Sequence, residues 1–132
     1  MGEMKLLLDT HTLLWWWGEP GKLSPRVLTL LRDPAYQIVV SAASAWEIAT
    51  KHRIGKYPPG GRIMDGWEQR LATDGFLELA MSSRHAFRAG SIISPHRDPF
   101  DRMLAAQSIL EHIPIVSADA AVSALGAERI WA

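Results

Sequence analysis

The chain has 132 residues, a length that fits one domain with a sizeable hydrophobic core. Its 14 basic and 14 acidic residues balance, which argues against nucleic-acid binding through one broad basic surface but is compatible with a local basic rim beside an acidic, metal-filled pocket. The chain contains no cysteine, so disulfide frameworks and thiolate zinc sites are excluded.

Hydrophobic patterning predicts short strands that alternate with helices. In chain order the predicted elements are a buried strand at 5–8, helices at 12–17 and 25–33, a buried strand at 37–40, a helix that opens at 41–44 and runs to about 54, a helix at 63–71, a strand at 76–80, helices at 83–89 and 100–112, a strand at 115–116, a helix at 120–125 and a strand at 129–131. This alternation predicts an α/β protein, a three-layer α/β/α domain with a mainly parallel sheet of roughly five strands.

The stretch richest in apolar residues near the start runs from 6 to 17, and polar residues from Asp9 to Thr12 interrupt it. It is too short and too polar to span a membrane, and no signal-peptide pattern precedes it. We therefore expect a cytoplasmic protein without a membrane partner.

Four acidic residues are predicted at the functional edge of the sheet. In open parallel sheets the functional crevice lies beyond the carboxyl ends of the strands. Asp9 directly follows the first predicted strand, and Asp119 lies just after the fourth. Glu47 sits one turn into the helix that follows the second strand, and Asp101 sits in the first turn of a later helix. All four carboxylates are therefore expected in one crevice.

Such a crevice needs a counter-ion, because converging carboxylates repel one another. Mg²⁺ and Mn²⁺ prefer oxygen ligands and accept carboxylates together with water. These ions suit phosphodiester hydrolysis, since they polarise the phosphoryl group and generate a nucleophile from water.

Simpler structural roles exist for two of these residues at strand ends. Asp9 is also placed to be the N-cap of the helix that follows it. Asp119 is likewise placed to cap the predicted helix at 120–125. Position alone leaves both interpretations open.

The two helical carboxylates also have alternatives. Glu47 fits a surface ion pair with Lys51 at i, i+4, although its apolar neighbours favour an inward position. Asp98 fits an N-cap, with Pro99 at the first helical position. Asp101 is explained only partly by the helix dipole, so it is the better candidate ligand of the pair.

Three segments carry a resemblance to a known family. They are LLLDTHTLLW at 6–15, SAASAWEI at 41–48 and HRDPFDRML at 96–104, and SAD at 117–119 adds a fourth. Together they closely resemble the VapC-type toxins, which are the PIN-domain ribonucleases of bacterial and archaeal toxin–antitoxin pairs. The likeness runs from Met4 to the end of the chain, in order and at the expected spacing.

The resemblance implies one PIN-like domain over residues 1–132, with residues 1–3 as an extension outside the fold. It implies a Mg²⁺- or Mn²⁺-dependent endoribonuclease whose acidic positions fall on Asp9, Glu47, Asp101 rather than Asp98, and Asp119. Ser117 falls where a hydroxyl often assists such a site. The resemblance also implies a homodimer and a cognate antitoxin protein, which would place a C-terminal segment across the active-site groove in a larger assembly.

Other residues are weighed for roles in binding. Trp15, Trp16 and Trp17 cannot all face one core from a helix, so exposed aromatic rings for a partner surface are expected; the alternative is two core rings and one lone surface ring. The basic residues expected near the site are Lys51, Arg53, Lys56, Arg97 and Arg102. They are candidates for RNA phosphate contacts or members of an ordinary solvated face, and Arg102 is expected to be structural. The five histidines lack metal-ligand spacing and are expected to pack or to form hydrogen bonds.

Two other functions compete with the ribonuclease. A phosphatase of the haloacid-dehalogenase type needs a second aspartate two positions after Asp9, and His11 stands there. A non-catalytic PIN-like module would bind RNA or protein without cleavage, but all four acidic positions are filled. Cleavage of RNA that requires Mg²⁺ or Mn²⁺ would separate the enzyme from the module.

Overall fold

Strand β1 (Met4–Leu8) lies at the centre of the sheet in the computed structural model, which describes residues 4–132. The described residues form five strands in the order β3–β2–β1–β4–β5, and every pair is parallel. The other strands are β2 (Tyr36–Ser41), β3 (Leu77–Leu79), β4 (Ile115–Val116) and β5 (Arg129–Ile130). The predicted sheet is therefore confirmed. The extension expected at residues 1–3 lies outside the described residues.

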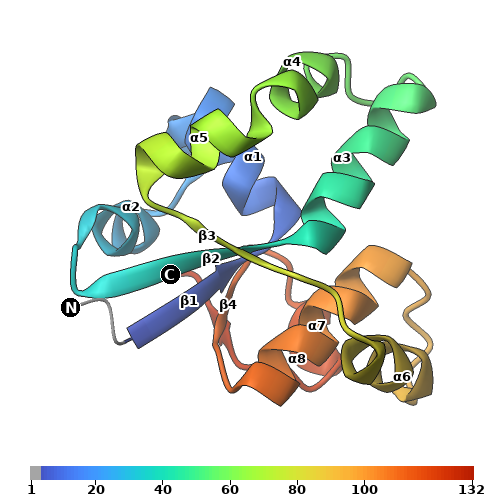
Figure 1. The fold of residues 1–132 in the computed structure, drawn as a ribbon. Coiled ribbons are helices and arrows are strands. Elements are labelled where there is room, and N and C mark those ends of the chain that lie inside the picture. The colour runs from blue at the N-terminus through green and yellow to red at the C-terminus, as the bar shows by residue number, and fades with distance from the viewer. Residues whose placement is uncertain (1–3) are drawn as a thin grey trace.

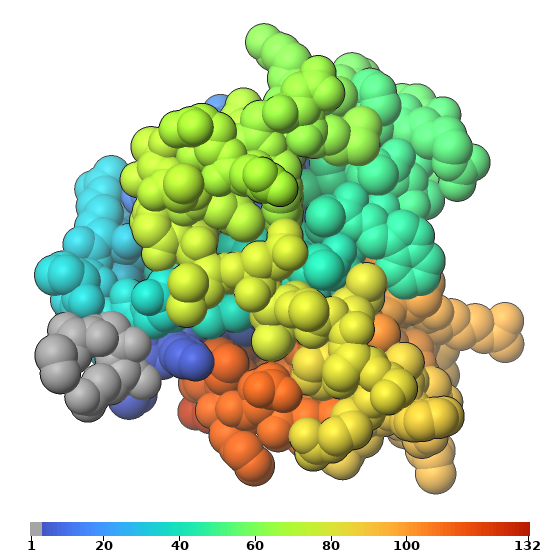
Figure 2. All heavy atoms as spheres, viewed as in Figure 1, coloured from blue at the N-terminus to red at the C-terminus, as the bar shows by residue number. Residues whose placement is uncertain are grey.

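Helices cover both faces of the sheet. They are α1 (Thr10–Gly18), α2 (Pro25–Arg32), α3 (Ala42–Arg53), α4 (Gly60–Asp65), α5 (Trp67–Asp74), α6 (Ser83–Ser91), α7 (Pro99–Glu111) and α8 (Ala121–Ala124), with a 3₁₀ turn η1 (Pro20–Lys22). Figure 1 shows α1, α2 and α5 on one side of the sheet and α6, α7 and α8 on the other. Figure 2 shows the segment with β3 crossing the molecule between α5 and α6. The α/β/α layering is confirmed.

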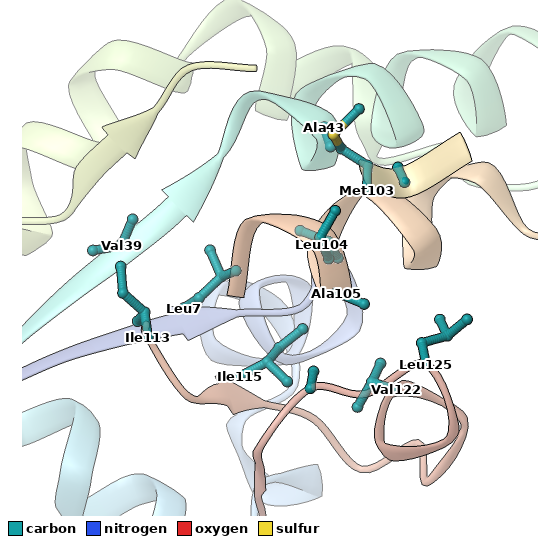
Figure 3. Close-up of a cluster of buried hydrophobic side chains, with 13 residues drawn as sticks. Leu7, Val39, Ala43, Met103, Leu104, Ala105, Ile113, Ile115, Val122 and Leu125 are labelled. Carbon is teal, nitrogen blue, oxygen red and sulfur yellow. The ribbon is translucent and has the colours of Figure 1, made fainter. Parts of the chain in front are cut away.

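The strands supply two hydrophobic cores because neighbouring side chains in a strand point to opposite faces. Leu7 faces the core formed with α6, α7 and α8, and Figure 3 shows it near Val39 and Ile115. These two residues are its register partners on the neighbouring strands. Leu6 and Leu8 face the other core, with α1, α2 and α5. Both faces of β1 are therefore buried from Leu6 to Leu8, which explains the apolar run at these three positions.

The helix predicted at 63–71 is two helices. Gly66 separates α4 from α5, because glycine is a poor helix former and its φ and ψ here are −106° and 16°. The first helix also begins earlier than predicted, at Gly60. A Cβ at Gly60 would lie 2.9 Å from His52 Cβ, so the absence of a side chain lets α4 pack closely on α3.

The prediction of exposed rings at Trp15 to Trp17 is wrong. All three are half-buried and pack against the same core. Their ring neighbours are Trp131 at 5.9 Å, Phe76 at 6.4 Å and Trp67 at 5.7 Å, respectively. Asp74 also accepts hydrogen bonds from the indole N–H groups of Trp16 and Trp17, at 3.1 and 2.7 Å. Because core residues and α5 surround more than one side of α1, rings that diverge from the helix still find apolar neighbours.

Within residues 4–132, each helix falls short of the length or the hydropathy needed to cross a membrane.

Truncation of Leu7 should destabilise the fold strongly. The side chain is fully buried at the centre of the sheet, so Leu7→Ala should lower the free energy of unfolding by about 2–5 kcal/mol. Urea unfolding followed by circular dichroism measures this. Leu77→Ala, at a side chain 50% exposed on β3, is the matched control and should stay within about 0.5 kcal/mol. Similar losses in both variants would contradict this assignment of the core.

Candidate active site

Asp9 begins the site at the carboxyl end of β1. Its backbone N–H donates to Val116 O at 3.1 Å, which ties it to β4. One carboxylate oxygen accepts from the backbone N–H of Thr12 at 2.7 Å, and the other accepts from the Ser117 hydroxyl. Asp9 is only 6% exposed. The capping role is therefore confirmed, and the same carboxylate also faces the end of the neighbouring strand.

Glu47 lies inward on α3 and is 3% exposed. Lys51 Nζ lies 2.6 Å from its Oε2, so the i, i+4 ion pair is formed even though Glu47 is buried. The Thr10 hydroxyl donates to the Ser44 hydroxyl at 2.9 Å and joins the start of α1 to α3. Glu47 therefore lies on a helix that this hydrogen bond ties to Thr10, the residue after Asp9.

Asp98 and Asp101 divide the two roles expected at the start of α7. Asp98 Oδ1 caps the helix by accepting from the backbone N–H groups of Phe100 and Asp101, at 2.9 and 3.2 Å. Asp101 is half-buried, and its Oδ2 lies 2.9 Å from His96 Nε2. Because Asp98 caps the helix, the Asp101 carboxylate takes no part in capping and pairs with His96.

Arg102 holds the segment that carries His96. Its guanidinium donates to the backbone carbonyls of Ala89 (2.9 Å), His96 (2.8 Å) and Ile92. These bonds fix the connection between α6 and α7, because one rigid fork holds three points of that chain segment. The structural role expected for Arg102 is confirmed.

Burial and neighbouring charge shape the electrostatics of the carboxylates. Burial raises the pKa of Asp9, and the hydrogen bond from Ser117 opposes that shift. Burial also raises the pKa of Asp101; the charges of Asp98 and Glu47 add to this, and the bond to His96 opposes it. Glu47 on α3 and Asp101 on α7 therefore lie close enough to repel, which is the condition that a bound cation relieves.

The carboxylates share one edge of the sheet without forming a closed cage. Among residues 4–132, no three histidine or acidic side chains lie close enough together to hold a metal ion as they stand. Asp9 is instead engaged with Ser117, Glu47 with Lys51, and Asp101 with His96. The donor chemistry, buried or half-buried carboxylate oxygens with excess negative charge, fits Mg²⁺ or Mn²⁺. Binding would require these side chains to exchange their present partners.

Asp119 and Ser117 lie at the end of β4. Asp119 is exposed, and its Oδ1 accepts from the backbone N–H of Ala121 at 2.9 Å. The N-cap position of α8 is Ala120, without a side-chain cap, so the capping role expected for Asp119 is wrong; the helix begins one residue later than predicted. Ser117 is fully buried; its hydroxyl binds Asp9 and accepts from the Asp119 N–H at 3.0 Å. A metal-binding role for Asp119 stays a prediction.

The predicted basic residues differ in their contacts. Lys51 is committed to Glu47, whereas Arg53 and Arg97 are exposed, and their contacts with RNA stay predictions. Sequence reasoning missed the Thr10–Ser44 bond and the pairing of His96 with Asp101. The only signal for either was a polar residue in or just before the first turn of a helix, which does not identify a partner.

Fold and site together define a class of protein: a parallel α/β domain with buried acidic side chains just beyond the carboxyl ends of its central strands. The chain belongs to the PIN-domain family, whose sequence model matches residues 6–128. Members of this family are generally nucleases. A search of curated protein sequences finds no match.

Solved structures of similar fold come from toxin–antitoxin systems. The structure of VapBC2 from Rickettsia felis bound to a promoter DNA fragment has a chain with a TM-score of 0.72 and 14% identity, covering 98% of this chain and 100% of that one. VapBC-1 from nontypeable Haemophilus influenzae gives 0.65 and 16%, covering 96% and 97%. FitAcB from Neisseria gonorrhoeae gives 0.62 and 19%, covering 95% and 96%. At these identities the likeness establishes the fold.

Removing the charge of Asp9 should stabilise the metal-free protein. Because burial raises the pKa of this carboxyl above 3.8, ionisation costs stability as pH rises through the raised value. Asp9→Asn should therefore increase Tm in EDTA at pH 7, and a gain of about 1 kcal/mol corresponds to roughly 3–5 °C. The gain should be smaller at about pH 4.5, where the parent carboxyl is closer to protonated.

Differential scanning calorimetry at both pH values measures this effect. The exposed Asp65→Asn variant is the control and should leave Tm nearly unchanged. A lower Tm for Asp9→Asn at pH 7 would show that the hydrogen bonds to the ionised carboxylate outweigh its burial.

Proposed function

We propose that the protein is a metal-dependent endoribonuclease and the toxin of a type II toxin–antitoxin pair. The observation that supports the proposal is a PIN domain in which Asp9 follows β1, Glu47 lies buried on the helix after β2, and the charge of Glu47 helps to raise the pKa of Asp101. The toxin–antitoxin role is supported by the similarity of the whole chain to proteins in VapBC and FitAB complexes.

In this proposal Asp9, Glu47 and Asp101 hold Mg²⁺ or Mn²⁺, and Asp119 supports a second ion or its waters. Such an ion, when bound, supplies the positive charge that polarises a phosphodiester and favours attack by water. Thr12 N–H and the Ser117 hydroxyl orient Asp9 from both of its oxygens. Exchange of Lys51 from Glu47 would free its ammonium to contact an RNA phosphate.

One observation favours a second function, a non-catalytic PIN-like module that binds RNA or protein. The carboxylates are each hydrogen-bonded to a separate neighbour, and no three within residues 4–132 form a ready metal site. A module that never binds a metal would keep this arrangement. A cleavage assay with added ions separates the two functions.

Neutralising Asp101 should abolish RNA cleavage and leave the fold intact. Asp101→Asn removes a charge that the proposal assigns to metal binding, so the cleavage rate should fall at least about 100-fold. Labelled RNA incubated with Mg²⁺ or Mn²⁺ and resolved on a denaturing gel measures this, with EDTA as the blank. Circular dichroism checks the fold.

Asp98→Asn is the matched control. Asparagine caps a helix as well as aspartate does, so this variant should cleave at the parent rate. Cleavage by Asp101→Asn at the parent rate would show that Asp101 is not needed for the reaction. Cleavage in EDTA would show that the reaction does not require a metal ion. Failure of the parent protein to cleave with either ion would support the non-catalytic module.

Induced expression of the parent protein should slow bacterial growth, since the proposed substrate is RNA. Co-expression of the protein encoded immediately upstream, the expected antitoxin, should restore growth. Growth curves with parent, Asp101→Asn and Asp98→Asn proteins measure this, and arrest is expected from the parent and Asp98→Asn only. Equal growth arrest by all three proteins would show that toxicity does not depend on the nuclease activity.

We also propose that the protein is a homodimer, alone and in the larger antitoxin complex.

A further inference from the structure

The amide of Gln107 is a buried polar group that the proposed mechanism does not use. It is fully buried on α7, the helix that also carries Asp101. Its Nε2 donates to the backbone carbonyl of Ala80 at 3.2 Å and lies 3.4 Å from Nδ1 of His85. Because a carbonyl only accepts, Nε2 must face Ala80, and Oε1 accepts from the hydroxyl of Ser41. One amide therefore joins α7 to α6, to the segment after β3 and to the end of β2.

Ser41 connects this amide to the start of α3. It ends β2 and is the N-cap of α3, where its hydroxyl accepts from the backbone N–H of Ala43 at 2.9 Å. The same hydroxyl donates to Gln107. The first turn of α3, the helix that carries Glu47, is therefore tied directly to α7.

A second contact joins the two helices further along α3. The rings of Trp46 and Phe100 pack edge to face, with centroids 4.6 Å apart and an angle of 76° between the ring planes. Ala43 packs in one core with Met103 and Leu104, as Figure 3 shows. The start of α3 thus meets the later part of α7, and the middle of α3 meets the start of α7.

The two candidate ligands on these helices follow the two rings directly in the sequence. Glu47 comes after Trp46, and Asp101 comes after Phe100. The charge of Glu47 contributes to the raised pKa of Asp101, so the two carboxylates interact. Since each stands on its own helix, their separation depends on the spacing of α3 and α7. Mg²⁺ demands near-ideal octahedral geometry, so its binding is sensitive to that separation.

We propose that Gln107 is a positioning residue: its hydrogen bond to Ser41 sets the spacing of α3 and α7, and with it the separation of the Glu47 and Asp101 carboxylates. The inference rests on the proposed metal-dependent function and adds to it a residue outside the acidic group. Gln107 and Ser41 are both fully buried. Loss of one therefore leaves the other unpaired unless the helices move.

The simpler interpretation is that the amide only satisfies buried polar groups and stabilises the fold. Its loss would then lower Tm but would leave the spacing of the helices unchanged. A probe of that spacing that needs no metal separates the two interpretations. Trp46 supplies one, because the ring current of Phe100 changes the NMR frequency of nuclei on a ring packed against it.

The first measurement is the ¹⁹F NMR spectrum of the full chain in EDTA, with 5-fluorotryptophan at all six tryptophan positions. The resonance that disappears in Trp46→Phe is that of Trp46. Gln107→Met keeps an unbranched side chain of similar length without the amide, and Ser41→Ala removes the partner hydroxyl. Both variants should move the Trp46 resonance by more than its linewidth.

The second measurement is the affinity for Mn²⁺, by isothermal titration calorimetry. Gln107→Met and Ser41→Ala should each raise the Kd about 10-fold or more, as does the loss of other residues that orient metal ligands without touching the metal. This readout reports on the carboxylates without requiring an RNA substrate.

Ser24→Ala is the matched control for Ser41→Ala. Ser24 caps α2 and also donates to the backbone carbonyl of Trp131 at 2.6 Å. Its replacement therefore removes a helix cap and a tertiary hydrogen bond, as Ser41→Ala does, but between other elements. Tm should fall, while the Trp46 resonance and the Kd for Mn²⁺ should stay unchanged.

Ser108→Ala is the matched control for Gln107→Met. Ser108 is the next residue of α7, is buried, and donates to the backbone carbonyl of Ile113 at 2.5 Å. Its loss removes a buried hydrogen bond of α7 at the end away from Asp101. It should lower Tm without moving the Trp46 resonance or changing the Kd for Mn²⁺.

The outcomes separate this inference from the proposed function. An unmoved Trp46 resonance, equal movement in the controls, or a moved resonance with unchanged Mn²⁺ affinity would overturn the positioning role. If Gln107→Met does not fold, Ser41→Ala and its control decide. If the parent protein binds no Mn²⁺ while the resonance moves only in Gln107→Met and Ser41→Ala, Gln107 still sets the helix spacing and the metal-dependent function falls.

Discussion

Parallel pairing of β1 with β2 on one side and β4 on the other is the constraint on which the site depends. Parallel strands end at the same edge of a sheet, so the residues after β1, at the end of β2 and after β4 are brought together from positions about 9, 41 and 117. Leu7 secures this arrangement, since it lies opposite both Val39 and Ile115. The central strand is buried on both faces, and the polar residue that follows it must therefore find hydrogen-bond partners. Asp9 finds them in Thr12 and Ser117.

Charge balance within the site explains its present arrangement. Buried carboxylates are costly unless they are paired or hydrogen-bonded. Here each of the three has a local partner: a hydroxyl for Asp9, an ammonium for Glu47 and an imidazole for Asp101. The mutual repulsion of Glu47 and Asp101 remains. In the proposed metal site, one divalent cation would replace these three separate partners and neutralise the three carboxylates together.

Helix α1 contributes to both the hydrophobic core and a cleft of about 590 Å³ that residues of α1, α3, α4 and α5 line. Its tryptophans pack on the core through Trp131, Phe76 and Trp67, while Trp15 and Trp17 also line the cleft beside Glu47. A ring that is half-buried can stabilise the fold with one face and offer the rest to a ligand. The structure thus gives the tryptophan triplet a place that neither sequence interpretation anticipated.

Local sequence determined the elements and the candidate ligands. Continuous apolar runs identify the buried parallel strands, and Asp98-Pro99 identifies a helix start. Asp9 and Asp119 were found because they follow predicted strands, and Glu47 and Asp101 because they lie near the starts of predicted helices. These signals depend on neighbours in the chain. Tertiary structure alone decided which groups meet. The pairings of Ser117 with Asp9 and of His96 with Asp101 and the packing of all three tryptophans depend on distances between segments far apart in sequence or on side-chain direction. Helical and strand periodicity carries no information about either, because it describes one element at a time.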